Sequence, residues 1–167
     1  MPALQEGDWV LSESEAINEY LEERYPQPAM LPQDLQLRAR VRFLCRFHDL
    51  YLEPRVRALF AHVKPAQRQD AQVQALHHEI DQRVAQLAAW VQPSPFLLTP
   101  AISLADCGPL VTLPLATLVL AACGQTLQLP AHLQAWLDHA SAHTAVSQAL
   151  QPWRRATADW LQAAAGT

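Results

Sequence analysis

The chain has 167 residues, and its 16 acidic and 12 basic side chains give a formal net charge of -4 at pH 7. Half of the residues are hydrophobic, so a chain of this length can bury about 70% of the surface of its unfolded form. No basic stripe of the kind that binds nucleic acid stands out. We therefore expect one compact protein with no nucleic-acid partner.

The sequence also disfavours a membrane protein and a metal-binding protein. The longest apolar stretch, PLVTLPLATLVLAAC at 109–123, contains two prolines and is shorter than the ~20 residues of a membrane span. The first residues lack the apolar run of a signal peptide. Cys45, Cys107 and Cys123 have unrelated spacings within apolar helical patterns, which favours buried thiols over disulfides or a metal cluster. We expect a cytoplasmic protein with no membrane partner and no metal.

The opening MPALQEGDWVLSESEAINEYLEERYP, residues 1–26, predicts two short strands and a helix. The strands are expected near 3–5 and 9–12, around a Glu6–Gly7 turn. Ser12 and Glu15 have the spacing of a capping box at the start of the helix. The proline-rich YPQPAMLPQD at 25–34 is the natural boundary, so we divide the chain into a unit at 1–26, a linker at 27–34 and a domain at 35–167.

Apolar residues then recur at helical spacing and predict five helices. The first stripe, which ends or bends near Pro54, contains Leu37, Val41, Leu44, Cys45, His48 and Tyr51. The second contains Val73, Leu76, Ile80, Val84, Leu87 and Val91. A third helix starts near Ser103. A fourth helix follows Pro130, and its inward face contains Leu133, Trp136 and Leu137. The last stripe contains Val146, Ala149, Leu150, Trp153, Trp160 and Leu161.

The third helix has a specified start and an apolar circumference. In ISLADC, residues 102–107, Ser103 and Asp106 have the spacing of a capping box, and we assign them a structural role. The helix that follows is almost entirely apolar and contains Pro109, which should bend its first turns. A helix that is apolar all round belongs at the centre of a bundle.

Three stretches together resemble the glutathione S-transferase family: MPAL with WVLSESEAINEYLEERYP, LQLRARVRFL at 35–44, and ISLADC. LQAWLDHASAHTAV at 133–146 is a weaker fourth match, and the similarity covers nearly the whole chain. The resemblance implies a mainly α fold. A partial thioredoxin-like β-β-α unit would precede the five-helix C-terminal domain of that family.

The resemblance also implies positions for ligands. Ser14, at the start of a helix, would bind the γ-glutamyl carboxylate of glutathione, and Glu13 would receive its ammonium group. Met1, the residue before Pro2, would offer its backbone to the cysteinyl part. The pocket for a small electrophile would be lined by Phe43, Phe47 and Tyr51. The six arginines between 38 and 57 either line a groove for an anionic substrate or solvate the outer side of a helix.

Two functions remain open at this stage. The first is a glutathione transferase that conjugates glutathione to an electrophile. In this family a hydroxyl or thiol donor near the first strand activates the glutathione thiol, and those elements would precede Met1. We therefore assign no catalytic residue and expect little conjugation from these 167 residues alone. The alternative is a non-catalytic transferase-like dimerisation or interaction domain. In either case we expect a homodimer that uses residues 1–25 and the helices at 36–61 and 68–92.

Overall fold

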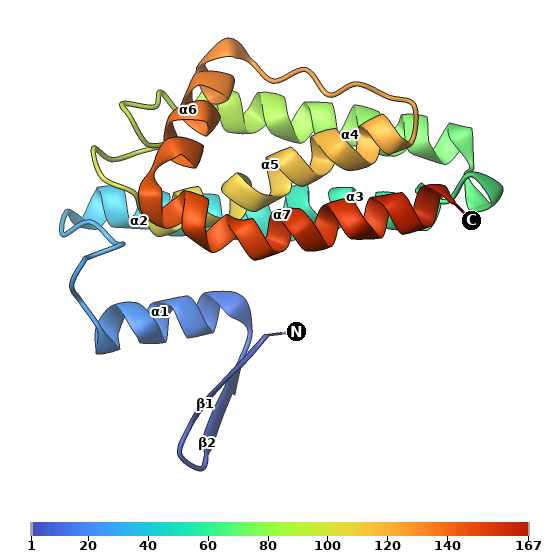
Figure 1. Cartoon of the computed structure of the whole chain (residues 1–167). Coiled ribbons are helices and arrows are strands. Elements are labelled where there is room, and N and C mark those ends of the chain that lie inside the picture. The colour runs from blue at the N-terminus through green and yellow to red at the C-terminus, as the bar shows by residue number, and fades with distance from the viewer. Residues whose placement is uncertain (1, 167) are drawn as a thin grey trace.

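The computed structural model describes residues 2–166 and begins with a β-hairpin followed by a helix (Figure 1). Strands β1 (Ala3–Glu6) and β2 (Trp9–Ser12) pair antiparallel. Gly7 lies in the turn with a φ of 61°, a conformation that glycine adopts without steric cost. Helix α1 (Ser14–Arg24) follows β2. The β-β-α order expected from the sequence is confirmed.

A helical body forms the rest of the chain (Figure 1). Helix α2 (Leu35–Phe47) continues through a π-helical turn (His48–Leu52) into α3 (Glu53–Ala58) and a 3-10 turn (Leu59–His62). A second 3-10 turn (Pro65–Gln67) precedes α4 (Asp70–Trp90). The last helices are α5 (Leu104–Ala122), α6 (Ala131–Ala142) and α7 (Thr144–Ala165). The first of the five predicted helices is thus present in segments, with Pro54 in the first turn of α3.

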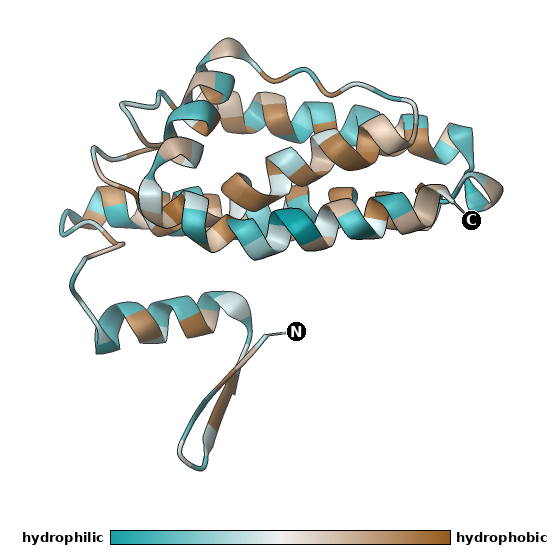
Figure 2. Cartoon of the chain, viewed as in Figure 1, coloured by the Kyte–Doolittle hydropathy of each residue, from teal (hydrophilic) through white to brown (hydrophobic). Residues whose placement is uncertain are grey.

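Helix α5 lies at the centre and contacts α2, α3, α6 and α7. Leu113 and Leu120 are fully buried, but Leu118 is 44% exposed, so the prediction of a helix buried all round is wrong at that position. Figure 2 shows α5 as an apolar ribbon along most of its length. By length and composition α5 could cross a membrane, and half of its most apolar window is buried inside the structure, as is common for core helices of soluble proteins.

The start of α5 confirms the predicted capping box. Ser103 is the N-cap, and the Asp106 carboxylate accepts from the Ser103 amide at 2.9 Å. The same carboxylate also accepts from the Leu97 amide at 2.9 Å and from Trp136 Nε1 at 2.8 Å. The cap of α5 is therefore joined to the preceding loop and to α6.

The predicted capping box between Ser12 and Glu15 is not formed. Ser12 ends β2, and Glu13 is the N-cap of α1, where no side chain of the described residues 2–166 makes a capping bond. The Glu15 carboxylate instead accepts from Asn18 Nδ2 at 3.2 Å. Because β2 continues through Ser12, Glu13 takes the N-cap position, and the helix begins one residue later than the pattern suggests.

The apolar stripes are confirmed along α4 and α6 and only partly along α2 and α7. In α4 the buried residues are Val73, Ile80, Val84 and Leu87. Tyr51 is half-exposed, because the π-helical turn before α3 uses more residues per turn than an α-helix and moves it out of the 3.6-residue phase. In α7, Ala149 is exposed and Thr157 is buried.

Polar contacts fasten the N-terminal unit to the helical body. Arg42 of α2 donates two bonds to the Glu19 carboxylate of α1, at 2.7 and 2.6 Å. The Glu22 carboxylate accepts from the amides of Met30 and Leu31 in the connection, each at 2.9 Å. The Leu104 amide donates to the Met30 carbonyl at 3.0 Å. These bonds set the distance between α1 and the body, and so shape the space between them.

Candidate functional site

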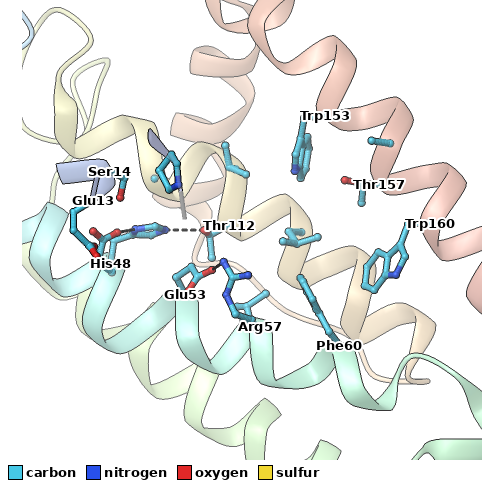
Figure 3. Close-up of a pocket in the computed structure, with 17 residues that line it drawn as sticks. Glu13, Ser14, His48, Glu53, Arg57, Phe60, Thr112, Trp153, Thr157 and Trp160 are labelled. Atoms are coloured by element: carbon cyan, nitrogen blue, oxygen red, sulfur yellow. Dashed lines mark hydrogen bonds and ion pairs between the residues drawn. The ribbon is translucent and has the colours of Figure 1, made fainter. Parts of the chain in front are cut away.

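A cavity of about 840 Å³ lies between the start of α1 and the helical body, within the size range of small-molecule sites. Residues from α1, the π-helical turn, α3, α5 and α7 face it (Figure 3). The side chains that matter most below are Pro2, Glu13, Ser14, His48, Asp49, Glu53, Arg57, Phe60, Thr112, Trp153, Thr157 and Trp160.

The mouth of the cavity carries a helix N-terminus. Ser14 is the first residue of α1, where free backbone amides and the helix dipole favour an anion. Glu13 has a φ of 74° and is the one non-glycine residue with positive φ in the described part of the chain. A conformation of this kind costs about 1–3 kcal/mol and is often found at ligand sites. The backbone is therefore strained at the edge of the cavity.

The opposite wall is aromatic. Phe60 and Trp160 pack against each other, with ring centroids 4.8 Å apart and ring planes tilted by 54°. Trp153 lies about two turns before Trp160 on α7 (Figure 3). Val111 and Leu115 of α5 add aliphatic surface to the same cavity. The sequence placed Trp153 and Trp160 on an inward stripe but did not show that this stripe faces a cavity. Their wall can hold the apolar body of a ligand.

The remaining wall is polar. His48 lies between the Asp49 carboxylate, 2.8 Å from Nδ1, and the Thr112 hydroxyl, 2.7 Å from Nε2. Glu53 and Arg57 form an ion pair one helical turn apart. The cavity thus combines an anion-binding mouth, an aromatic wall and a hydrogen-bonded histidine.

Comparisons with known proteins agree with this arrangement. Residues 1–29 match the model of the glutathione S-transferase N-terminal domain. Glutathione S-transferase theta-1 of Homo sapiens is 38% identical over 116 residues, which are 64% of this chain and 48% of that protein. The theta class glutathione S-transferase of Xanthomonas axonopodis pv. citri, solved with glutathione bound, superposes with a TM-score of 0.69 at 27% identity. The superposition covers 90% of this chain and 72% of that one.

The chain is similar to glutathione S-transferases in the sequence of its first 29 residues and in its fold. The maleylpyruvate isomerase of Ralstonia sp is a further relative, 48% identical over 54 residues, or 32% of this chain and 26% of that protein. The chain spans less than half the length of these curated relatives. The transferase fold accounts for both parts of the structure: a partial thioredoxin-like unit with β1, β2 and α1, and the all-α domain after it.

Three of the predicted glutathione contacts come together in this transferase-like cavity. Pro2, Glu13 and Ser14 all line it, and their role in binding stays a prediction. Met1, the fourth predicted contact, lies outside the described residues.

The predicted electrophile residues do not share that cavity in the described part of the chain. Phe43 and Phe47 instead pack on Trp90 of α4, with ring centroids 4.9 Å away in each case. The Tyr51 ring lies beside that of Phe47, with centroids 5.9 Å apart. Phe43 and Phe47 thus lie on the side of α2 that packs on α4, and neither is among the described residues that line the cavity. Phe60, Trp153 and Trp160 take the position that was predicted for them.

Ser103 and Asp106 are buried at the α5 cap and are not among the cavity residues named for the described chain. Their predicted structural role is confirmed. His139 and His143, which are one turn apart, flank the Phe96 ring at 5.5 and 6.2 Å. Within residues 2–166, no group of three or more His, Cys, Asp or Glu side chains could hold a metal ion.

The thiols next to the cavity are held in the protonated form. Burial raises the pKa of Cys107 to about 11, and the Asp106 and Glu15 carboxylates add to the rise. Burial also raises the pKa of Cys45 far above its ordinary value, again with help from Glu15. A thiol with a pKa of about 11 is ionised to roughly one part in 10,000 at pH 7. Neither cysteine is a nucleophile at neutral pH, as the sequence predicted.

We expect the rate at which iodoacetamide alkylates Cys107 in the folded chain to rise about tenfold per pH unit from pH 7 to pH 10, because the thiolate fraction rises so. The same residue in urea should instead level off near its ordinary pKa of about 8.5. Peptide mass spectrometry at each pH measures both rates. A plateau below pH 9 in the folded chain contradicts the assignment.

Proposed function

We propose that this chain provides the γ-glutamyl anchor and the electrophile pocket of a glutathione-dependent transferase. The observation that carries the proposal is that Ser14, at the start of α1, and the aromatic pair Phe60 and Trp160 line one cavity. Glutathione conjugation needs both features within reach of a single tripeptide. The solved relative with bound glutathione supports the choice of ligand.

Each part of the cavity has a role in the proposal. The Ser14 hydroxyl and the first amides of α1 bind the γ-glutamyl carboxylate, and the helix dipole adds attraction. The Glu13 carboxylate pairs with the neighbouring ammonium group. The electrophile packs on Phe60, Trp153 and Trp160, which bury apolar surface and favour planar groups.

Conjugation also needs a group that stabilises the glutathione thiolate. Cys45 and Cys107 are not among the described residues that line this cavity, so we assign neither of them as that donor. We therefore propose that the 167-residue polypeptide binds glutathione and its S-substituted derivatives but conjugates glutathione to 1-chloro-2,4-dinitrobenzene at close to the uncatalysed rate. Turnover well above that rate in purified protein contradicts this part of the proposal.

We expect Ser14→Ala to weaken binding of S-hexylglutathione about tenfold, because a hydrogen bond to a charged group is lost at the mouth of the cavity. This ligand presents both the γ-glutamyl carboxylate and an apolar tail for the aromatic wall. Isothermal titration calorimetry measures the affinity directly.

Ser12→Ala is the matched control, because Ser12 is exposed at the end of β2, two residues from Ser14. It should bind as the unmodified chain does. Equal affinities for the Ser14 and Ser12 variants contradict the anchor, and a folded chain that binds no S-hexylglutathione contradicts the proposed function.

A non-catalytic dimerisation role is the second candidate, because the hairpin exposes apolar side chains. Trp9 is 46% and Val10 57% exposed, and an isolated two-stranded hairpin is marginally stable in water. We propose that the chain forms a homodimer through residues 1–25 with α2, α3 and α4. Sedimentation at micromolar concentration should show a dimer that Trp9→Ser weakens. A monomer whose first 25 residues resist protease contradicts it.

The expected cytoplasmic location is part of the same proposal. It is supported by the three free cysteines, Cys45, Cys107 and Cys123, which suit a reducing compartment.

A further inference from the structure

The histidine of the cavity is held at both ring nitrogens. Its Nδ1 lies 2.8 Å from Asp49 Oδ1 and its Nε2 lies 2.7 Å from Thr112 Oγ. His48 is 8% and Thr112 4% exposed, so water competes little for these bonds. Gly108 packs on the ring so closely that a Cβ there would lie 2.6 Å from Nδ1. The ring therefore has one orientation.

The chemistry of the three groups fixes the direction of the hydrogen bonds. An ionised carboxylate only accepts, so His48 Nδ1 must carry the hydrogen that bonds to Asp49. In the neutral ring Nε2 then carries none and must accept. The Thr112 hydroxyl consequently donates to His48, and its oxygen keeps lone pairs that no ring hydrogen occupies.

Thr112 lines the cavity together with Pro2 and Ser14, and Figure 3 shows its hydroxyl between His48 and the open space. We propose that Asp49 and His48 lock the Thr112 hydroxyl as a hydrogen-bond acceptor for a donor group on the bound ligand. This inference rests on the proposed function, in which that donor is the thiol of glutathione. Thr112 is then a specificity residue that distinguishes the free peptide from its S-substituted products.

This fixed orientation of the Thr112 hydroxyl, called the lock below, also explains why binding of glutathione need not lead to its conjugation. A hydrogen bond accepted from the S–H group stabilises the protonated thiol and gives nothing to the thiolate. The cavity would hold free glutathione in its unreactive form until another group takes the proton.

Calorimetry with glutathione and S-methylglutathione tests the ligand contact. The unmodified chain should bind glutathione about fivefold more tightly, the effect of one modest hydrogen bond. Thr112→Val, which keeps the shape and removes the hydroxyl, should abolish this preference and leave the affinity for S-methylglutathione unchanged. Thr112→Ser should retain it. A preference that survives in Thr112→Val overturns the contact, and so does a folded chain that binds S-hexylglutathione but shows no preference.

Nitrogen-15 NMR of the imidazole groups tests the lock without any ligand. In the free chain at pH 8, His48 should show a neutral ring with its hydrogen on Nδ1. A hydrogen on Nε2, or a ring protonated at both nitrogens, overturns the lock whatever binds. If no glutathione derivative binds, the proposed function and the ligand contact fail together, while the NMR result still decides the lock.

Discussion

Replacement of Asp106 by alanine is expected to lower the free energy of unfolding by about 4 kcal/mol, the sum of a lost helix cap and several orphaned donors. The carboxylate is fully buried and accepts from the Leu97 and Ser103 amides and from Trp136 Nε1. Without it these donors stay buried and unpaired, which costs more than the bonds themselves contribute. Urea unfolding followed by circular dichroism measures the change.

Asp106→Asn separates charge from geometry. Oδ1 accepts from Leu97 and Trp136, and Oδ2 accepts from both the amide and the hydroxyl of Ser103. Whichever oxygen becomes an NH2 group faces a donor, so asparagine should also destabilise the fold strongly. Asp138→Ala is the control, since this exposed α6 carboxylate bonds only to Gln134 among the contacts described, and it should change stability by less than about 0.5 kcal/mol. Similar losses for Asp106→Ala and Asp138→Ala contradict the account.

Local patterns predicted the helical part of the fold well because short-range chemistry decides it. The Ser103 and Asp106 pair requires only a three-residue spacing, and the structure has that cap. The α4 stripe depends only on the helical period, and its predicted residues Val73, Ile80 and Val84 are buried. The same holds for the hairpin, where a glycine supplies the positive φ of the turn.

The cavity was harder to predict because its walls meet only in the folded chain. Ser14 was found from its place at a helix start, whereas Trp153 and Trp160 looked like ordinary core residues on α7. The sequence did not indicate where Phe43 packs, because helical spacing alone does not say which neighbour a face meets. In the structure that face meets Trp90 of α4. The apolar periodicity of the sequence did not predict the π-helical turn that brings His48 opposite Thr112.

The two faces of α5 provide the last test, because one helix offers a buried and an exposed leucine five residues apart. Leu113 is fully buried and Leu118 is 44% exposed. Leu113→Ala should lower the free energy of unfolding by about 3 kcal/mol, since it removes buried methyl groups and leaves a cavity that the packed neighbours cannot fill. Leu118→Ala should cost less than about 1 kcal/mol, because little apolar surface is lost there and alanine is the better helix former.

Urea unfolding of both variants gives the comparison, with the slope of the transition checked for two-state behaviour. The pair shares helix, residue type and substitution, so helix propensity cancels and the difference of about 2 kcal/mol reports packing. Equal losses of unfolding free energy in Leu113→Ala and Leu118→Ala would mean that the Leu118 side chain is buried as well. Because the chain alone exposes that side chain, its cover would have to come from a second molecule. Repeating the unfolding at several protein concentrations would then show the loss at Leu118 growing with association.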